Sequence, residues 1–234
     1  MNQPYHIYYQ DSDVSHITSV IIDCGKDCRG NYFIPDQTIF HPEEAGQPED
    51  RGVATIRQIH FPITGLAINA HHMVKHYTSS PLTGDLKKET VALTVDLVRR
   101  RELARWHTAG HLIKHIIEQH RPELIAVKES HFPGHATLIL HSLKKKPFSQ
   151  NDLTYLLTLL TKEISAILAH SRPIIIDSGA VRKVHIEGVK SFPCKGIYVK
   201  TTADLRPITI EKVHMNRKSE VMISYSTGMS SAGG

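Results

Sequence analysis

The hydrophobic pattern of this chain changes from a strand period to a helix period near Val95, and no other sequence feature constrains the fold as strongly. Before that point, short apolar and β-branched runs at 18–22, 54–61 and 66–77 predict strands. Stretches rich in Gly, Pro and charge predict turns at 25–27, 48–52 and 62–65. Short strands divided by such turns are typical of a small barrel. We therefore predict an N-terminal β-barrel domain over residues 1–90.

Beyond Val95, apolar residues recur at helical spacing as far as Ile117 and predict a long helix that ends before Pro122. A second helix is predicted over 153–169, because Ser149 offers an N-cap with an acidic residue, Asp152, three positions later. Further strands are predicted at 136–141, 174–177, 181–186, 197–200, 208–214 and 221–225, with a hairpin turn at 215–219. Residues 91–234 are thus predicted to form an α+β domain of two helices against a mostly antiparallel sheet.

The composition is that of an ordinary globular protein, with 40% hydrophobic and 22% charged residues. No stretch reaches the roughly 18–20 apolar residues that span a bilayer, so no membrane partner is expected. Residues 1–12 are polar and lack the apolar core of a secretory signal. The three cysteines are too few and odd in number for a disulfide framework, which favours a reducing compartment. A cytoplasmic location is therefore expected.

Basic residues cluster in short runs, and the formal net charge is +5. The runs lie at 99–101, 144–146 and 217–218. Such clusters suit a polyanionic partner such as nucleic acid. Each run alone is equally typical of a solvated turn or a helix end, so the charge leaves both interpretations open.

Two histidines on the first predicted helix, His107 and His111, have the spacing of a metal-binding pair. Residues four apart share one face of a helix, about 5–6 Å apart at Cβ, so both imidazoles can reach one ion. The metalloprotease version of this pattern carries a Glu after the first His, whereas Thr108 stands there in this chain, which excludes that activity. The alternative is a packed or solvated histidine pair.

Cys194 is a candidate third ligand, because it lies in a predicted turn that leads into a strand and zinc accepts sulfur beside imidazole nitrogen. The alternative is a small buried cysteine, which is common. Cys24 and Cys28 have no matching His or Cys pair beside them, so they are interpreted as ordinary thiols.

Taken together, these motifs resemble the alanyl-tRNA editing proteins of the AlaX group, which are similar to the editing domains of alanyl- and threonyl-tRNA synthetases. The resemblance covers about residues 38–225. Residues 38–52, which include Gly46 and Gln47, look like the family's stretch with Gly-Gly-Gln, and 96–100 look like the segment before its first histidine motif. His107 and His111 fall on the family's HxxxH, Cys194 falls on the Cys of its CxxxH, and 202–205 are similar to the segment that follows.

The resemblance implies a trans-editing hydrolase that deacylates mischarged tRNA, with Ser or Gly attached to the alanine tRNA. It implies a zinc ion held by His107, His111 and Cys194. It also implies substrate-binding roles for Gly46, Gln47 and Thr202. The expected contacts to tRNA phosphates come from Arg99, Arg100, Lys144, Lys145 and Lys146.

One departure from the family pattern concerns the metal. The CxxxH motif ends in His, but the residue four positions after Cys194 is Tyr198. A phenol has a pKa near 10 and is a poorer ligand than imidazole at neutral pH. Two options remain: a three-ligand zinc site with water or Tyr198 in the fourth position, or a site that has lost its metal.

These options leave several activities open. The first is an aminoacyl-tRNA deacylase, zinc-dependent or zinc-impaired. The second is a tRNA- or RNA-binding module of the same fold without catalysis. The third is an unrelated metal-dependent hydrolase that acts on small esters.

Overall fold

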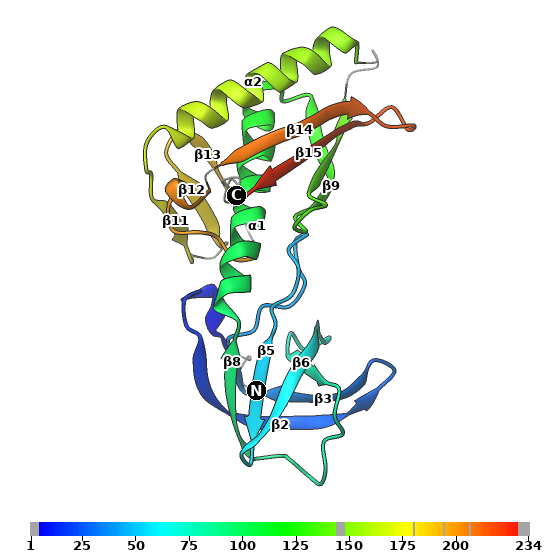
Figure 1. Cartoon of the computed structure of the whole chain (residues 1–234), viewed down its shortest axis with the longest axis vertical. Helices are drawn as coiled ribbons and strands as arrows, with labels where there is room; N and C mark the ends of the chain where they lie inside the picture. The colour runs from blue at the N-terminus through cyan, green and yellow to red at the C-terminus, as the bar shows by residue number, and fades with distance from the viewer. Residues whose placement is uncertain (1–4, 144–147, 180, 194, 206, 229–234) are drawn as a thin grey trace, which may run out of the picture. The chain divides into compact units, whose positions relative to one another are not determined.

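The computed structural model describes residues 5–143, 148–179, 181–193, 195–205 and 207–228. These residues form two compact units, one drawn from blue to green and one mainly from green to red (Figure 1). The first unit contains the chain up to Glu44 together with Pro48–Arg101, and the second contains Ala45–Gln47 and the chain from Glu102 onwards. The first unit therefore extends past residue 90 to Arg101, and a short segment from the N-terminal half packs within the second unit.

The first unit is a closed antiparallel barrel, as the turn-punctuated pattern predicted. Its strands follow the order β2-β3-β7-β6-β5-β8 around the barrel. Their bounds are β2 (His16–Asp27), β3 (Gly30–Pro35), β5 (Gly52–Ile56), β6 (Ile59–Ile68), β7 (Val74–Thr78) and β8 (Thr90–Val95). A parallel pair, β1 (Tyr5–His6) and β4 (Gln37–Thr38), and a short 3-10 helix, Ile7–Tyr9, accompany it. Alternate residues of β8 are buried, as expected for strands whose inner face fills a small barrel.

Three details of this barrel differ from the sequence prediction. The predicted strand 54–61 is a hairpin, because Arg57 and Gln58 turn the chain with φ angles of 48° and 64°. The predicted turn 62–65 lies inside β6, where Pro62 pairs with Val53. The predicted strand 66–77 is broken by a turn, in which the Asn69 side chain accepts hydrogen bonds from two backbone N–H groups. The hairpin was missed because its turn lacks the Asn-Gly or Asp-Gly pair that favours positive φ.

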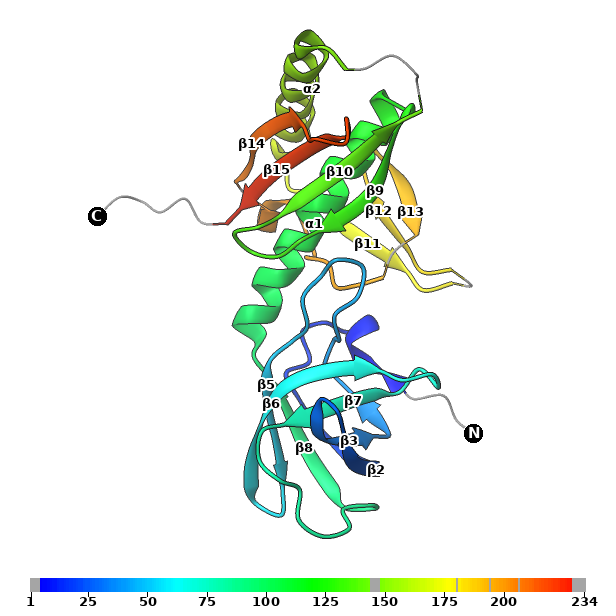
Figure 2. The ribbon, with the colours of Figure 1, turned by 90° about the vertical axis from the view of Figure 1, so that its right-hand side faces the viewer.

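The second unit is the predicted α+β domain of two helices and antiparallel sheets (Figure 2). A four-stranded sheet has the order β14-β15-β10-β9, and a three-stranded sheet has the order β11-β12-β13. The helices are α1 (Leu97–His120) and α2 (Gln150–Leu168). The strands are β9 (Leu124–Ser130), β10 (Thr137–Ser142), β11 (Ile174–Asp177), β12 (Lys183–Ile186), β13 (Val189–Pro193), β14 (Ile208–Met215) and β15 (Val221–Thr227). A 3-10 helix, Thr202–Leu205, precedes β14.

The start of α2 confirms the predicted capping box. The Ser149 side chain accepts a hydrogen bond from the Asp152 N–H, and the Asp152 carboxylate accepts one from the Ser149 N–H. The two bonds satisfy backbone donors that a helix start otherwise leaves open. In the ranges that the structure describes, no helix is both long and apolar enough to cross a membrane.

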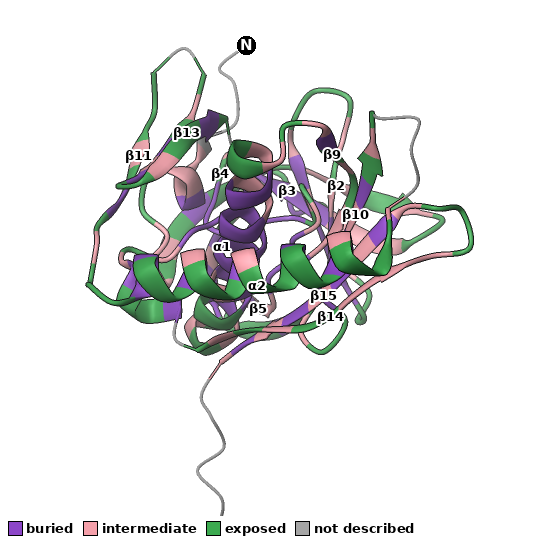
Figure 3. Cartoon of the chain, turned by 90° about the horizontal axis from the view of Figure 1, so that it is seen from above, coloured by how far each residue is buried: buried purple, intermediate pink, exposed green. Residues whose placement is uncertain are grey.

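Helix α1 is the buried centre of the second unit. Figure 3 shows much of it in the colour of buried residues, and residues 106–113 are all buried. Leu103, Leu112 and Ile113 are inaccessible to solvent, and so is His107, a polar residue of the same helix. A polar side chain on such a helix must find a partner inside the protein or be poised for a ligand.

The segment predicted as a strand at 197–200 forms no strand. Its backbone N–H groups are bound by side chains instead: Ile197 donates to Gln47 Oε1 at 2.8 Å, and Val199 donates to Thr108 Oγ1 at 3.1 Å. These bonds hold Tyr198 beside α1 and bring the segment Ala45–Gln47 to the same place.

Candidate metal centre

Three buried histidines, His107, His111 and His131, form a cluster whose ligand nitrogens all lie within 4.8 Å of one another. His107 and His111 lie on α1, as their spacing predicted, and their Nε2 atoms are 3.1 Å apart. His131 follows the end of β9 and was not predicted. Its ring centroid lies 5.1 Å from that of His107 and 5.3 Å from that of His111. Three imidazoles in this arrangement could hold a transition-metal ion.

Hydrogen bonds fix which ring nitrogen of two of these histidines is protonated. His107 Nδ1 lies 3.1 Å from the carbonyl oxygen of Ile197, which can only accept, so Nδ1 carries the proton. His131 Nδ1 lies 2.7 Å from the Tyr225 hydroxyl, whose own proton goes to the carbonyl oxygen of Trp106 at 3.1 Å. The Tyr225 oxygen therefore accepts from His131. In both rings the lone pair therefore lies on Nε2, which is how metal-binding histidines are usually oriented, and Nε2 of His107 faces Nε2 of His111.

His111 is held neutral by its surroundings. Burial lowers the pKa of His111 well below 6.5, and the nearby His131 and Lys114 lower it further. Its ring stacks on Phe192 with a centroid distance of 5.6 Å and an interplanar angle of 6°. A neutral imidazole is the form that binds a metal, so this environment removes the competition from protons at pH 7.

Three glycines allow the close packing around the cluster. A Cβ at Gly110, between the two helix histidines, would collide with His131 Nδ1 and the Tyr225 hydroxyl. At Gly196 it would lie 2.8 Å from Gln47 Oε1, and at Gly46 it would lie 2.9 Å from the Glu129 carbonyl oxygen. A glycine inside a helix lowers helix stability by about 1 kcal/mol relative to alanine. Gly110 has this cost, but it leaves the space that the His131 ring occupies.

Glu129 adds a carboxylate next to the histidines. Its Oε2 lies 3.6 Å from His131 Nε2 and 3.9 Å from His111 Nε2, and its Oε1 lies 2.5 Å from Lys114 Nζ. Burial opposes ionisation of Glu129, but the adjacent Lys114 ammonium favours it, and the pKa of this carboxyl is lowered from its usual range. Glu129 is thus a carboxylate at neutral pH, able to bind a cationic group.

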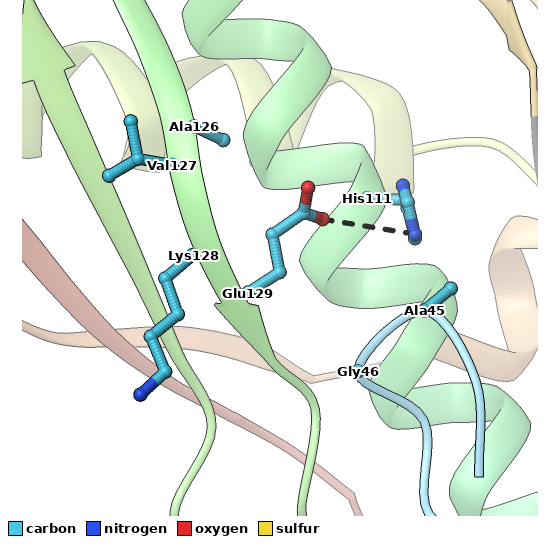
Figure 4. Close-up of a pocket in the computed structure, with 7 residues that line it drawn as sticks. All are labelled: Ala45, Gly46, His111, Ala126, Val127, Lys128 and Glu129. Atoms are coloured by element: carbon cyan, nitrogen blue, oxygen red, sulfur yellow. Dashed lines mark ion pairs between the residues drawn. The ribbon is translucent and has the colours of Figure 1, made fainter.

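A cavity of about 270 Å³ adjoins the cluster (Figure 4). Figure 4 shows the Glu129 carboxylate turned toward His111, with Ala45 and Gly46 on a neighbouring loop. The cavity is lined by Ala45, Gly46, His111, Ala126, Val127, Lys128 and Glu129. Three of the seven lining residues are Ala or Gly, and the cavity offers room for a ligand group beside an imidazole and a carboxylate.

The predicted substrate-binding residues have different surroundings. Gly46 lines the cavity, and its carbonyl oxygen accepts a hydrogen bond from the His131 N–H at 2.9 Å. Gln47 is fully buried, and its Nε2 has no hydrogen-bond partner among the residues that the structure describes. Thr202 does not line this cavity; its hydroxyl donates to the His170 carbonyl and accepts from the Arg172 N–H.

The two remaining metal candidates from the sequence are Cys194 and Tyr198. Cys194 lies outside the described residues. Tyr198 is 3% exposed, and its ring meets the His107 ring edge-on at a centroid distance of 4.7 Å. Tyr198 therefore packs directly against the histidine cluster.

The predicted tRNA-binding residues divide into three groups. Lys144, Lys145 and Lys146 lie outside the described residues. Arg99 is partly buried and donates to the Glu49 carbonyl oxygen at 3.3 Å. Arg100 is 1% exposed and pairs with Asp50 at 2.6 Å inside the first unit. A guanidinium so enclosed has no face open to a phosphate, so we leave Arg100 out of the proposed tRNA surface below.

His131 and Glu129 are the residues that sequence reasoning missed. Neither has a regular spacing to His107 and His111, since both come from a strand end that only the fold brings to α1. The one local sign was Gly110, because a glycine in the middle of an otherwise continuous helix pattern indicates close approach of another group.

Comparison with known proteins confirms the resemblance that the motifs indicated. No protein-family model matches the chain. An alanyl-tRNA editing protein AlaX-M from Methanosarcina acetivorans is 23% identical over 91% of this chain and 94% of its own length. An alanine–tRNA ligase from Methanobrevibacter smithii is 24% identical over 95% of this chain. Another from Haloquadratum walsbyi is 32% identical over 47% of this chain.

The extent of these matches differs between the two kinds of relative. The chain covers 27% of the Methanobrevibacter ligase and 11% of the Haloquadratum ligase, but nearly all of the editing protein. Its similarity is therefore to one region of the ligases and to a whole alanyl-tRNA editing protein.

Proposed function

We propose that this chain, a relative of the alanyl-tRNA editing proteins, is an aminoacyl-tRNA deacylase that hydrolyses the ester between serine or glycine and the alanine tRNA. The observation that carries the proposal is the buried cluster of His107, His111 and His131, of which His111 lines a small cavity. Hydrolysis of an ester needs a polarised carbonyl, an activated water and a place for the acyl group, and this region offers candidates for each.

The residues fit a bound zinc ion. His107 and His131 present Nε2 lone pairs into the cluster, and His131 Nε2 is buried without a hydrogen-bond partner in the described structure. His107 and His111 are the proposed ligands, and Cys194 is proposed as a further ligand on its sequence position alone. When bound, zinc would supply Lewis acidity to the ester carbonyl or to a water molecule.

The protein's own groups then account for binding. The Glu129 carboxylate can hold the ammonium group of the amino acid, because its lowered pKa keeps it charged at neutral pH. Gly46 leaves space at the cavity wall, and Gln47 holds the backbone of Ile197 in place. A cavity of about 270 Å³ beside Glu129 has room for an acyl group such as seryl or glycyl.

Binding of tRNA is proposed to involve phosphate contacts from Arg99 and the lysines at 144–146. Such contacts position the nucleic acid without reading its sequence. A translation-fidelity role in the cytoplasm is proposed with this activity.

The test is deacylation of alanine tRNA charged with serine, glycine or alanine, with and without a zinc chelator. We expect release of serine or glycine to exceed release of alanine, and chelation or His107→Ala to slow it by at least about 100-fold. His141→Ala, a change at an exposed histidine of β10, is the matched control and should keep wild-type activity.

Three results would contradict the proposal. Tight tRNA binding without release of any amino acid would indicate a non-catalytic binding module. Hydrolysis of small esters with no preference for charged tRNA would indicate a different hydrolase. Full activity after complete zinc removal would exclude the metal from the reaction.

A further inference from the structure

We propose that His131 takes the ligand position that the family motif gives to residue 198, so that three imidazoles, from His107, His111 and His131, hold the metal. The proposal deepens the proposed function, because it assigns the ligand set of the same site. It follows from the placement of His131 and from nothing in the local sequence motif.

The first argument is that His131 aims an unsatisfied lone pair into the cluster. Its Nδ1–H is committed to Tyr225, so Nε2 carries the lone pair, and this atom is fully buried with no hydrogen-bond partner among the described residues. Buried acceptors are nearly always satisfied in native proteins, and the exceptions call for a ligand or an ion.

The second argument comes from the contact between His107 and His111. The Nε2 atom of His107 carries a lone pair, and it lies 3.1 Å from Nε2 of His111. Without a metal, a proton on His111 Nε2 makes this contact a hydrogen bond to His107, and a cation could take the place of that proton. Two ligands of a tetrahedral zinc with bonds of 2.0–2.1 Å are ~3.4 Å apart, so the pair is already close to that spacing. Bringing in the third nitrogen, within 4.8 Å, needs a contraction of at most ~1.4 Å.

The third argument is that the surroundings hold His131 in place. The His131 N–H donates to the Gly46 carbonyl oxygen at 2.9 Å, and a Cβ at Gly46 would lie 3.2 Å from His131 Cδ2. On the opposite side, Gly110 leaves the room that the ring occupies against α1. Backbone and glycine spacing thus preorganise this imidazole, as a bound metal requires.

Two nearby side chains are weaker candidates. His115 continues the α1 row, but its Nδ1 lies 2.8 Å from Glu118 and its ring stacks on Phe192 at 3.8 Å. Tyr198 packs against His107, but a phenol with an ordinary pKa near 10 is a poor ligand at pH 7. His131 is the stronger candidate, because its Nε2 has no hydrogen-bond partner among the described residues and imidazole binds zinc at pH 7.

The experiment is a zinc titration by competition with a chromophoric chelator at one pH, on the full chain without tRNA. We expect His131→Gln to weaken zinc binding by more than about 100-fold, because losing a ligand should exceed the 10–100-fold cost of losing a residue behind one. Tyr198→Phe should stay within about threefold of wild type. His135→Gln, an exposed histidine in the same loop, is the matched control and should bind as wild type does.

X-ray absorption at the zinc edge is a second measurement, and on the wild-type protein alone it reports the number of imidazole ligands. We expect the scattering pattern of three imidazoles in the wild-type protein and of two in His131→Gln. Two imidazoles in the wild type, wild-type affinity in His131→Gln, or a large loss in Tyr198→Phe would overturn the assignment. Because these measurements involve no tRNA, a deacylase without the His131 ligand and a three-histidine site without deacylase activity give different results.

Discussion

Two fully buried histidines, His76 in the barrel and His131 in the α+β unit, differ in how their ring nitrogens are satisfied. Both rings use Nδ1–H to donate, His76 to the Val74 carbonyl at 3.0 Å and His131 to Tyr225. The Nε2 atom of His76 also has a partner, the Thr38 hydroxyl at 2.9 Å, whereas Nε2 of His131 has none among the described residues. Both ring nitrogens of His76 are thus satisfied within the core, whereas Nε2 of His131 can still bind a ligand.

The ion pair between Arg100 and Asp50 extends the same contrast. Arg100 donates to Asp50, to the carbonyl oxygens of Ser12 and Val14, and to that of Ile39, so both of its terminal nitrogens and Nε are occupied. Asp50 in turn accepts from the His41 N–H at 2.7 Å. The hydrogen bonds of Arg100 and Asp50 are complete, as expected of buried charged groups that stabilise the fold.

The largest effect is expected from breaking the satisfied cluster. Arg100→Leu leaves the Asp50 carboxylate buried without its counter-charge, which should lower the free energy of unfolding by about 3–5 kcal/mol. The free energies of unfolding of the variant and the wild type are measured by urea titration at pH 7. The neighbouring Arg101→Leu is the control and should cost less than about 0.5 kcal/mol, because the Arg101 side chain is 64% exposed. Similar losses in the two variants would remove the structural role assigned to Arg100.

A smaller effect is expected from acid acting on His76. Burial lowers its pKa from 6.5 to about 3, so below pH 6.5 the unfolded chain takes up a proton that the folded protein does not. Stability is therefore lost as the pH falls, by about 2 kcal/mol between pH 7 and pH 5 from this group alone. His76→Gln keeps a hydrogen-bond donor and an acceptor but does not titrate. Between pH 7 and pH 5 its free energy of unfolding should therefore fall by about 2 kcal/mol less than that of the wild-type protein. Identical pH profiles would contradict the argument.

The smallest effect on stability is expected inside the open cluster. His111→Phe replaces a neutral imidazole, already stacked on Phe192, with an apolar ring of similar shape. The change also removes the hydrogen bond between His111 Nε2 and His107 Nε2, so in metal-free protein the free energy of unfolding should fall by only about 0.5–1.5 kcal/mol, the net contribution of one hydrogen bond. Zinc binding should be lost at the same time. A loss of several kcal/mol without metal would place His111 with the satisfied groups of the barrel.

The fold was largely predictable because its signals are local. The helix pattern predicted α1, and the pair Ser149 and Asp152 predicted the start of α2. The errors fall where another part of the chain decides the structure. The turn at Arg57 and Gln58 follows the pairing of β5 with β6, and the segment at 197–200 gives its N–H groups to side chains.

The candidate site was predictable only in part, for the same reason. His107 and His111 are four residues apart, so helix geometry alone brings them together. His131 and Glu129 reach α1 through the packing of β9, a strand that the sequence pattern did not predict. No spacing rule links a helix to a strand end, and only the tertiary fold shows that their side chains meet.

The hydrogen bond from Ile197 to Gln47 joins residues that are 150 positions apart in the chain. During synthesis on the ribosome, Gly46 and Gln47 emerge early, but the backbone that Gln47 holds, whose carbonyl accepts a hydrogen bond from His107 Nδ1–H, is made near the end. Closing a contact of such long separation costs loop entropy. The three histidines are all synthesised by residue 131, well before the segment at 197 that orients His107.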